Sequence, residues 1–408
     1  MNDSKVINDP VFGFIKVPRG LLLDIVKHRL FQRLSRIKQL GMASVVYPGA
    51  QHTRFQHSVG AFYLMSEAVT HLRAKGIPIS DAEADAVKAA ILLHDVGHGP
   101  FSHVLEHTLV SNIDHEEISL LLMERINLEF GGRLDLAIRI YKDEYEKRFL
   151  HQLVSSQLDM DRLDYLRRDS FFTGVTEGNI GSARIIKMLN VKDDHLVVDS
   201  KGIYSIENFL TNRRLMYWQV YLHKTSVASE KMLVNALSRA KELAHQGVDL
   251  FASPALRYFL YNHITKETFY NDTECLDAFV HLDDNDIWCA LKVWASEKDR
   301  ILSTLSTGLV DRHLFKVEVS ESPISQAVRK EHIRRISNAL GITQKDAERY
   351  MITYTTLEKN MYSASDDHIE ILYRDGSAKD IAEASDMFNH SMLGKKVKKY
   401  YLCYMRNT

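Results

Sequence analysis

The chain has 408 residues, a formal net charge of −1 at pH 7, and ordinary shares of hydrophobic (45%) and charged (26%) residues. These values are typical of a globular protein with a real core, and they exclude a global positive field that would draw the whole chain to nucleic acid. Its cysteines, Cys275, Cys289 and Cys403, lie far apart, which argues against a disulfide framework. The polar N-terminus and the lack of long apolar runs predict a cytoplasmic protein without a membrane partner.

From the N-terminus to about residue 310 the apolar residues recur with a period near 3.6, which predicts helices. One helix is expected over 55–72, and a second over 84–94, which ends before the Gly-His-Gly-Pro turn at 97–100. Residues 195–206 are expected to form a hairpin with Ser200, Lys201 and Gly202 in its turn. A long helical pattern follows, from about residue 206 to 246.

The last hundred residues change character, because β-branched and aromatic residues become frequent. We therefore expect a mostly α domain over 1–310 and a smaller α+β region over 311–408. The predicted strands of this region are 314–319, 350–356, 369–373 and 398–405, and the predicted helices are 325–340 and 378–390.

Histidine is the feature of composition that points to chemistry: eight of the 19 histidines fall between residues 52 and 115. His94 and Asp95 end an apolar helix just before the Gly-Pro turn. His57 begins an earlier helix, and Asp159 and Asp161 both lie in a later one. Two histidines and two carboxylates would suit Mn, Fe, Ni, Co, Zn or Mg, although each residue alone has an ordinary structural explanation.

Five separated segments, taken together, resemble the HD-domain deoxynucleoside triphosphate (dNTP) triphosphohydrolases. They are IKQLG (37–41), HTRFQHSVG (52–60), LLHDVGHGPFSH (92–103), DMDRLDYLRRD (159–169) and YLHK (221–224). The resemblance implies an HD-domain helical bundle, a dimer or tetramer, and a nucleotide substrate. It also implies hydrolysis of a dNTP to a deoxynucleoside and inorganic triphosphate with one divalent metal ion per active site. The implied metal ligands are His57, His94, Asp95 and Asp161.

The same resemblance suggests how protons and phosphates are handled. His103 is the candidate general acid for the 5′ oxygen, and Glu106, one helical turn later, is placed to orient its ring. Glu106 stands where the family has Asp. His98 and His115 are expected beside the phosphates.

The expected substrate pocket also follows from the resemblance. Arg54 and Arg213 match phosphate-contacting positions, and Arg162 replaces a family lysine there. Tyr217 replaces a family histidine near the base, so base preference is not inherited. The residues expected around the sugar are Gln39, Leu40, Tyr165, Asp169 and Tyr221. A plain aromatic core stripe would explain the tyrosines equally well.

Two other functions stay open at this point. One is an HD phosphohydrolase of another nucleotide or phosphate ester, although no Gly-Tyr-Pro signature of cyclic dinucleotide phosphodiesterases follows His94–Asp95. The other is a nucleotide- or nucleic-acid-binding protein with little catalysis. Lys27 and Ser35 occupy positions where family members bind an activating guanine nucleotide, so activation of that kind is not expected.

Overall fold

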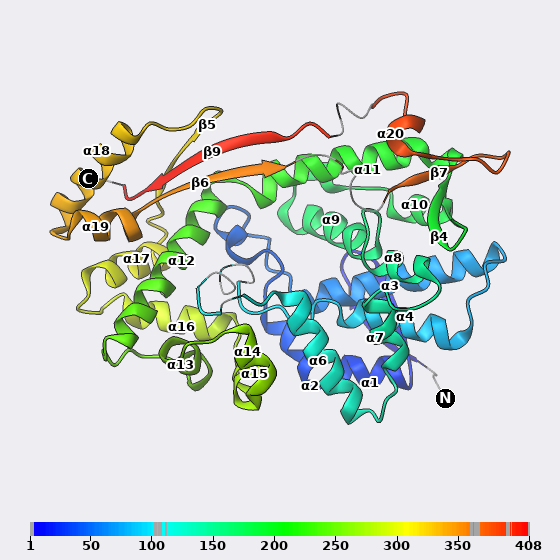
Figure 1. Ribbon diagram of the computed structural model, residues 1–408, viewed down its shortest axis with the longest axis horizontal. Helices are drawn as coiled ribbons and strands as arrows, with labels where there is room; N and C mark the ends of the chain where they lie inside the picture. Colours follow the sequence, from blue (N-terminus) through cyan, green and yellow to red (C-terminus); the bar gives the residue numbers. More distant parts are fainter. Residues whose placement is uncertain are drawn as a thin grey trace.

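The computed structural model describes residues 4–101, 104, 108–110, 112–359, 362, 368–388, 392 and 394–406. These residues form a mostly α-helical fold, as expected, and their strands make three small sheets (Figure 1). At its centre, α3 (Arg54–Ala74) packs against both α4 (Asp81–Leu93) and α9 (Met160–Thr173). These three helices position the candidate metal site.

Local sequence signals explain where the three central helices begin and end. Thr53 and Ser80 start α3 and α4 with capping boxes, in which side chains bond the free amides of the first helical turn. Asp159 caps α9 by accepting from the amide of Arg162. That helix ends at Gly174, whose φ of 75° is the left-handed conformation that glycine adopts without strain.

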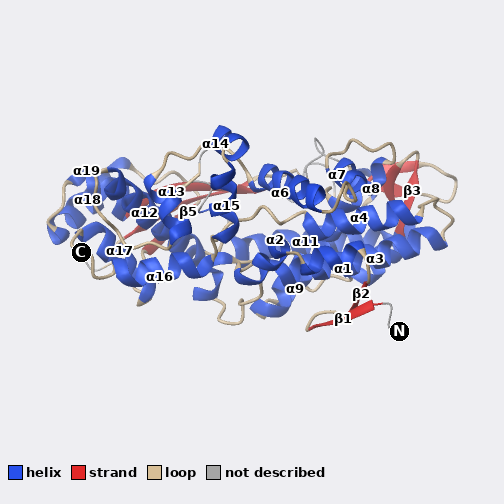
Figure 2. Ribbon diagram, turned by 90° about the horizontal axis from the view of Figure 1, so that it is seen from below, coloured by secondary structure: helices blue, strands red, loops and turns tan. Residues whose placement is uncertain are grey.

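Shorter helices cover the bundle, and an N-terminal hairpin projects from it (Figure 2). The hairpin was not predicted; β1 (Ser4–Asp9) and β2 (Gly13–Pro18) form it in antiparallel register. The covering elements are α1 (Leu21–Lys27), α2 (Arg29–Gln32), η1 (Arg33–Arg36), η2 (Gly41–Val45), α6 (His115–Glu129), α7 (Asp135–Tyr141) and α8 (Arg148–Val154).

The predicted hairpin at 195–206 is wrong in position. The hairpin is formed by β3 (Leu189–Lys192) and β4 (His195–Asp199), which turn through Asp193 and Asp194, both at positive φ. The short side chain of aspartate tolerates this conformation, but the charged Lys-Asp-Asp sequence contains no glycine and does not by itself predict a turn. Ser200–Gly202 (η4) instead leads into α11 (Ile203–Met216).

The long helix expected up to residue 246 is interrupted once. A π-helical segment, η5 (Tyr217–Tyr221), follows α11, and α12 (Lys224–His245) begins after it. Such π segments often occur at functional sites. The remaining helices of this part are η3 (Thr176–Gly178), α10 (Ser182–Met188), α13 (Pro254–Tyr261), α14 (Lys266–Asn271), α15 (Thr273–His281), α16 (Asp284–Trp294) and α17 (Arg300–Val310).

The C-terminal region mixes strands and helices, as predicted, and contributes to two sheets. In the first, β9 (Val397–Tyr404) lies between β5 (Lys316–Ser320) and β6 (Ile352–Lys359), all antiparallel. In the second, β7 (Glu370–Leu372) adds to β4 in parallel. The expected helix 378–390 is wrong over most of its described length, because a strand, β8 (Ala378–Asp380), stands at its start and the helix that follows, α20 (Ile381–Ala384), is a single short turn. The other elements are α18 (Gln326–Leu340), α19 (Gln344–Asp346), η6 (Ala347–Met351), β8 (Ala378–Asp380) and α20 (Ile381–Ala384).

One apolar core extends through the bundle and into the C-terminal region. Within the described ranges, none of the helices combines the length and the apolar character that a membrane span requires.

Candidate metal and nucleotide site

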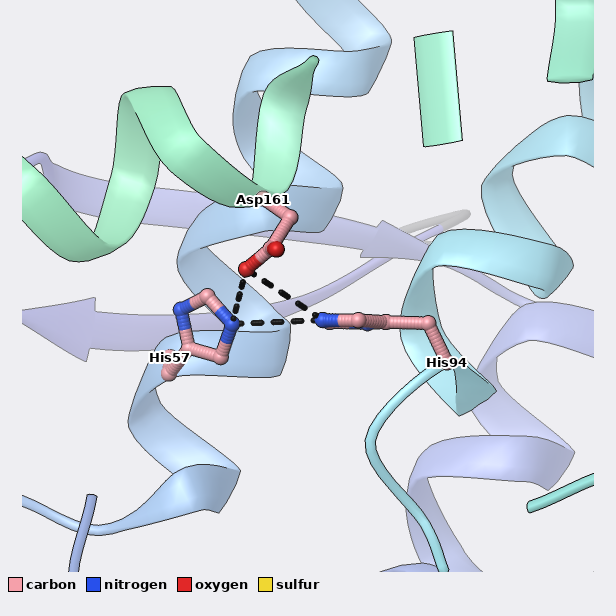
Figure 3. A group of neighbouring side chains, drawn as sticks. All are labelled: His57, His94 and Asp161. Carbon is pink, nitrogen blue, oxygen red and sulfur yellow. Dashed lines mark hydrogen bonds and ion pairs between the residues drawn. The ribbon is translucent and has the colours of Figure 1, made fainter. Parts of the chain in front are cut away.

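Three side chains from three helices converge at the centre of the bundle (Figure 3). The Nε2 atom of His57 in α3 lies 3.3 Å from Nε2 of His94, the residue that ends α4. Asp161, in the first turn of α9, brings Oδ1 to 3.0 Å from the His57 nitrogen and 3.5 Å from the His94 nitrogen. The ligand-type atoms thus surround one point from three sides.

Asp95 lies at the edge of this cluster. Its Oδ1 is 3.4 Å from Nε2 of His94, and its Oδ2 is 3.7 Å from Nε2 of His57. Oδ2 also accepts a 2.6 Å hydrogen bond from the guanidinium of Arg54. The structure therefore brings all four predicted ligands together and joins one of them to a predicted phosphate contact.

The structure also shows that Asp159 and Asp161, which the residue pattern alone did not distinguish as possible ligands, have different surroundings. Asp159 is buried and accepts from the backbone amide of Arg162 at 2.7 Å, so it serves as the cap of α9. Asp161 is the residue that faces the histidines.

The electrostatics of the cluster favour positive charge beside its carboxylates. Burial alone would lower the pKa of His57, but hydrogen bonds with Asp161 and Asp164 outweigh burial and raise it to about 10. Burial opposes ionisation of Asp95 as well, yet His94 and Arg54 hold its pKa well below the usual range. Two imidazole nitrogens facing each other at 3.3 Å, with carboxylates beside them, form the mixed N/O donor set that suits a divalent metal.

A second layer of side chains holds His57 in place. Its Nδ1 atom lies 2.7 Å from Oδ2 of Asp164, which fixes the ring so that Nε2 points to the cluster. Arg168 donates to the same carboxylate at 2.9 Å and to Asp9 of the N-terminal hairpin at 2.7 Å. Gly60 leaves room for this pair, because a Cβ there would lie 2.0 Å from Oδ1 of Asp164.

The loop after Asp95 is held against α6. The rings of His98 and His115 stack at a centroid distance of 3.9 Å, so the structure places two of the predicted phosphate contacts side by side. Burial and the neighbouring Arg54 lower the pKa of His98 well below its usual value, which keeps that ring neutral. A Cβ at Gly97 would lie 2.2 Å from the amide of Ser119, so glycine is required for this approach.

Arg33 fixes the same loop from the other side. Its fully buried guanidinium donates to the carbonyl oxygens of Val96 at 3.0 Å and His98 at 2.8 Å. It also donates at 3.4 Å to the carbonyls of Phe279 and Leu282. Burial lowers the pKa of Arg33 to about 9.

A group of tyrosines borders the cluster where the sugar was expected. The Tyr165 ring lies 6.5 Å from that of His57 and 6.0 Å from that of Tyr221. The Tyr221 hydroxyl donates to Asp169 at 2.8 Å, and the Tyr217 ring lies 5.3 Å from that of Tyr221. Burial raises the pKa of Tyr165 and of Tyr221, so both hydroxyls stay protonated near neutral pH. Four predicted substrate contacts are therefore neighbours.

Two buried polar atoms among the predicted contacts lack a hydrogen-bond partner within the part of the chain that is described: Oε1 of Gln39 and Nη1 of Arg213. Such atoms are costly to bury unpaired, which makes them candidates for contact with a ligand. Arg213 lies over the Tyr217 ring at 6.0 Å, and Leu40, directly after Gln39, is the N-cap residue of η2. Arg162, in contrast, already donates to Ser156 at 2.6 Å.

A cavity of about 160 Å³ opens beside the cluster of His57, His94 and Asp161. Besides His94, Asp95 and Asp161, it is lined by His115, Glu116, Tyr141, His151, Val154 and Ser155. The predicted acid His103 and its partner Glu106 lie outside the described residues.

Sequence reasoning did not assign several residues that shape this site. Asp164 and Arg168 lie in the segment DMDRLDYLRRD, but neither was given a role. His52 lies 2.7 Å from Asp169 and stacks on Phe172, with ring centroids 4.5 Å apart. His52, Asp164 and Arg168 lie in the segments HTRFQHSVG and DMDRLDYLRRD, which also contain predicted metal ligands, and this nearness could have suggested a role for them. Only the fold shows which of the residues are in contact.

Comparison with known proteins agrees with the geometry. A family model described as HD domain matches residues 54–169, and one described as HD associated region matches residues 180–252. The crystal structure of a phosphohydrolase from Bacteroides thetaiotaomicron is 68% identical, covers 99% of this chain and 100% of its own, and superposes with a TM-score of 0.96.

Two curated relatives extend the comparison. The uncharacterized protein YwfO of Bacillus subtilis is 31% identical over 100% of this chain and 93% of its own length. The deoxynucleoside triphosphate triphosphohydrolase SAMHD1 of Bos taurus is 28% identical over 83% of this chain, which spans 62% of that protein.

Proposed function

This chain belongs to the HD-domain family of phosphohydrolases, and from that premise we propose that it hydrolyses dNTPs to a deoxynucleoside and inorganic triphosphate. The observation that carries the proposal is that the candidate metal ligands and the expected sugar contacts lie next to each other. The cluster of His57, His94 and Asp161 lies beside a group of tyrosines, and a buried nitrogen of Arg213, next to Tyr217, has no hydrogen-bond partner within the described residues. The kinship with SAMHD1 supports the choice of substrate.

We propose that His57, His94, Asp95 and Asp161 hold one divalent metal ion, since their nitrogen and oxygen atoms lie close together and carry complementary charge. When bound, the metal would polarise a phosphoryl oxygen and lower the pKa of a coordinated water molecule. Asp164 keeps the Nε2 atom of His57 directed at the metal through the 2.7 Å contact with Nδ1.

The cationic side chains would neutralise the triphosphate. Arg54 already lies at the metal cluster through Asp95, and its guanidinium can contact a phosphate placed beside that carboxylate. Arg162 and Arg213 lie on the side of the site where the tyrosines are. The stacked rings of His98 and His115 lie on the other side, at the loop that follows Asp95. This distribution suits charge that spreads over several oxygens during phosphoryl transfer.

The sugar and the leaving group complete the proposal. Asp169, held by Tyr221, can accept a hydrogen bond from a sugar hydroxyl, with Tyr165, Gln39 and Leu40 as the other contacts. His103, oriented by Glu106, is the proposed donor of the proton that the 5′ oxygen takes up on leaving. Tyr217, rather than the family histidine, would contact the base.

The test is product analysis with metal-reconstituted protein. Each dNTP and NTP is incubated in water enriched in ¹⁸O, and products are identified by anion-exchange chromatography and mass spectrometry. We expect deoxynucleoside and inorganic triphosphate, with the label in the triphosphate, because water attacks the α-phosphorus. Release of pyrophosphate or orthophosphate, or a preference for another phosphate ester, would favour a different phosphohydrolase. Tight nucleotide binding without turnover would indicate a binding protein and refute the proposal.

A further inference from the structure

The three-stranded sheet of the C-terminal region and the helices next to it form a local basic unit. Residues 316–359 and 395–406 contain thirteen Lys and Arg residues against six Asp and Glu residues, a net charge of +7, whereas the whole chain carries −1. A concentrated positive charge in an otherwise neutral protein indicates a polyanionic partner. These residues include β5, β9 and β6, which lie side by side and run from one end of the molecule toward its middle (Figure 1).

One face of this sheet carries tyrosines. Tyr354 on β6 pairs with Leu402 on β9, and Thr356 pairs with Tyr400. Because side chains alternate along a strand, Tyr354 and Tyr400 lie diagonally on the same face. Their rings are nearly parallel, with an interplanar angle of 14° and centroids 6.3 Å apart. The two rings make a platform on an antiparallel sheet.

Cationic groups border that platform. The guanidinium of Arg329, on α18, lies 4.8 Å from the Tyr354 ring centroid, and the amine of Lys398 lies 5.5 Å from that of Tyr400. Nε of Arg329 is buried and has no hydrogen-bond partner among the residues that the structure describes. A cavity of about 370 Å³ opens beside Tyr354 and is lined by Gln326, Arg329, Lys330, Ile333, Glu348 and Ile352 as well.

We propose that this face, named here the Tyr354–Tyr400 platform, binds single-stranded nucleic acid. A base would stack on Tyr400 by displacing the flexible Lys398 amine from the ring to a phosphate, and a second base would lie beside Tyr354, against Ile333 and Ile352 of the cavity. Phosphates would contact Arg329, Lys330 and Lys398. The nearby Glu358 does not oppose this, because Lys396 pairs with it at 3.0 Å. Glu348, at the cavity wall, offers an acceptor to an exocyclic amine of a base.

The chemistry favours single strands over other polyanions. Stacking on a tyrosine requires an exposed base face, which a duplex does not offer. Inorganic polyphosphate would use the cations but not the rings. The inference does not depend on the proposed triphosphohydrolase activity, since none of its residues belongs to the metal and nucleotide site.

The experiment measures binding of a fluorescein-labelled, mixed-sequence DNA 20-mer to the full-length protein by anisotropy, over a series of salt concentrations. Contacts to about three phosphates predict a slope of roughly −2 for log K against log salt. Tyr400→Leu should weaken binding about tenfold or more, since it removes one stacking ring. Lys398→Gln, an exposed substitution, should weaken binding and flatten the salt slope. Absence of binding to the unmodified protein at low salt overturns the proposal.

Matched controls come from another cation–tyrosine pair. Lys379 lies 5.9 Å from the centroid of the Tyr373 ring, outside the basic unit. Tyr373→Leu and Lys379→Gln should leave binding within about twofold, and thermal melting should show that all four variants fold. If the control variants weaken binding as much as Tyr400→Leu and Lys398→Gln, the platform is not the site. Equal affinity for a duplex or for an abasic strand of the same length would refute base stacking.

Discussion

Replacing Asp164 by Asn offers the sharpest test of how the metal cluster is organised. The amide keeps the shape of the side chain but removes the charge that faces His57 at 2.7 Å and Arg168 at 2.9 Å. Loss of such a supporting partner typically lowers metal affinity by about 10- to 100-fold. Arg168 keeps its 2.7 Å contact with Asp9, so we expect an unfolding penalty of about 2–3 kcal/mol rather than the larger cost of a fully unpaired buried charge.

The assay is competition with a chromophoric chelator for Mn²⁺, together with urea unfolding. Asp159→Asn is the matched control, because Asp159 is equally buried on the same helix but caps α9 and does not face the histidines. Because asparagine caps a helix as well as aspartate does, we expect this control to lose no more than about 1 kcal/mol of stability, through its contact with Arg162, while its metal affinity stays within a few-fold of the unmodified protein. The reasoning is refuted if Asp164→Asn folds and binds Mn²⁺ as tightly as that protein does.

Three further predictions concern single substitutions. Asp161→Ala should abolish metal binding and turnover together, as measured by metal analysis and product assay; full activity would contradict its assignment as a ligand. Gly60→Ala should cost about 3 kcal/mol or more in urea unfolding, because its Cβ would lie 2.0 Å from Asp164, whereas Gly181→Ala, with no atom closer than 3.9 Å, should cost little. Burial opposes ionisation of Glu83, but Lys147 and Ser80 outweigh burial and lower its pKa to about 2, so its contribution is complete above pH 4.5 and is lost below it. Glu83→Gln should therefore destabilise by about 2 kcal/mol at pH 7, and this difference should shrink below pH 4.5; a difference that is constant with pH would contradict the shift.

The helices of the bundle could be predicted because their periodicity and their end signals agree. The predicted helix 84–94 differs from α4 (Asp81–Leu93) only at its ends. The capping box of Ser80 makes the helix begin three residues earlier than predicted. The hairpin could not be located in the same way. Lys192 to Asp194 is charged and contains no glycine, so the turn residues at positive φ were not visible in the sequence.

The four residues that converge at the candidate metal site could be named from the resemblance, but the side chains that hold them in place could not. That Asp161 rather than Asp159 faces the histidines depends on where α9 begins, because the cap residue and the first helical turn point in different directions. His52 and Asp169 are distant in the chain, and they meet because the segment that leads into α3 packs beside α9.

The parallel pairing of β4 with β7 has a consequence for biosynthesis. Val197 pairs with Glu370 and Asp199 with Leu372, so the edge of β4 has no partner in β7 until nearly the whole chain has left the ribosome. An open strand edge can pair with another nascent chain during that interval. Truncation before residue 370 would make this interval permanent, and we expect such fragments to aggregate even though they retain the complete metal cluster.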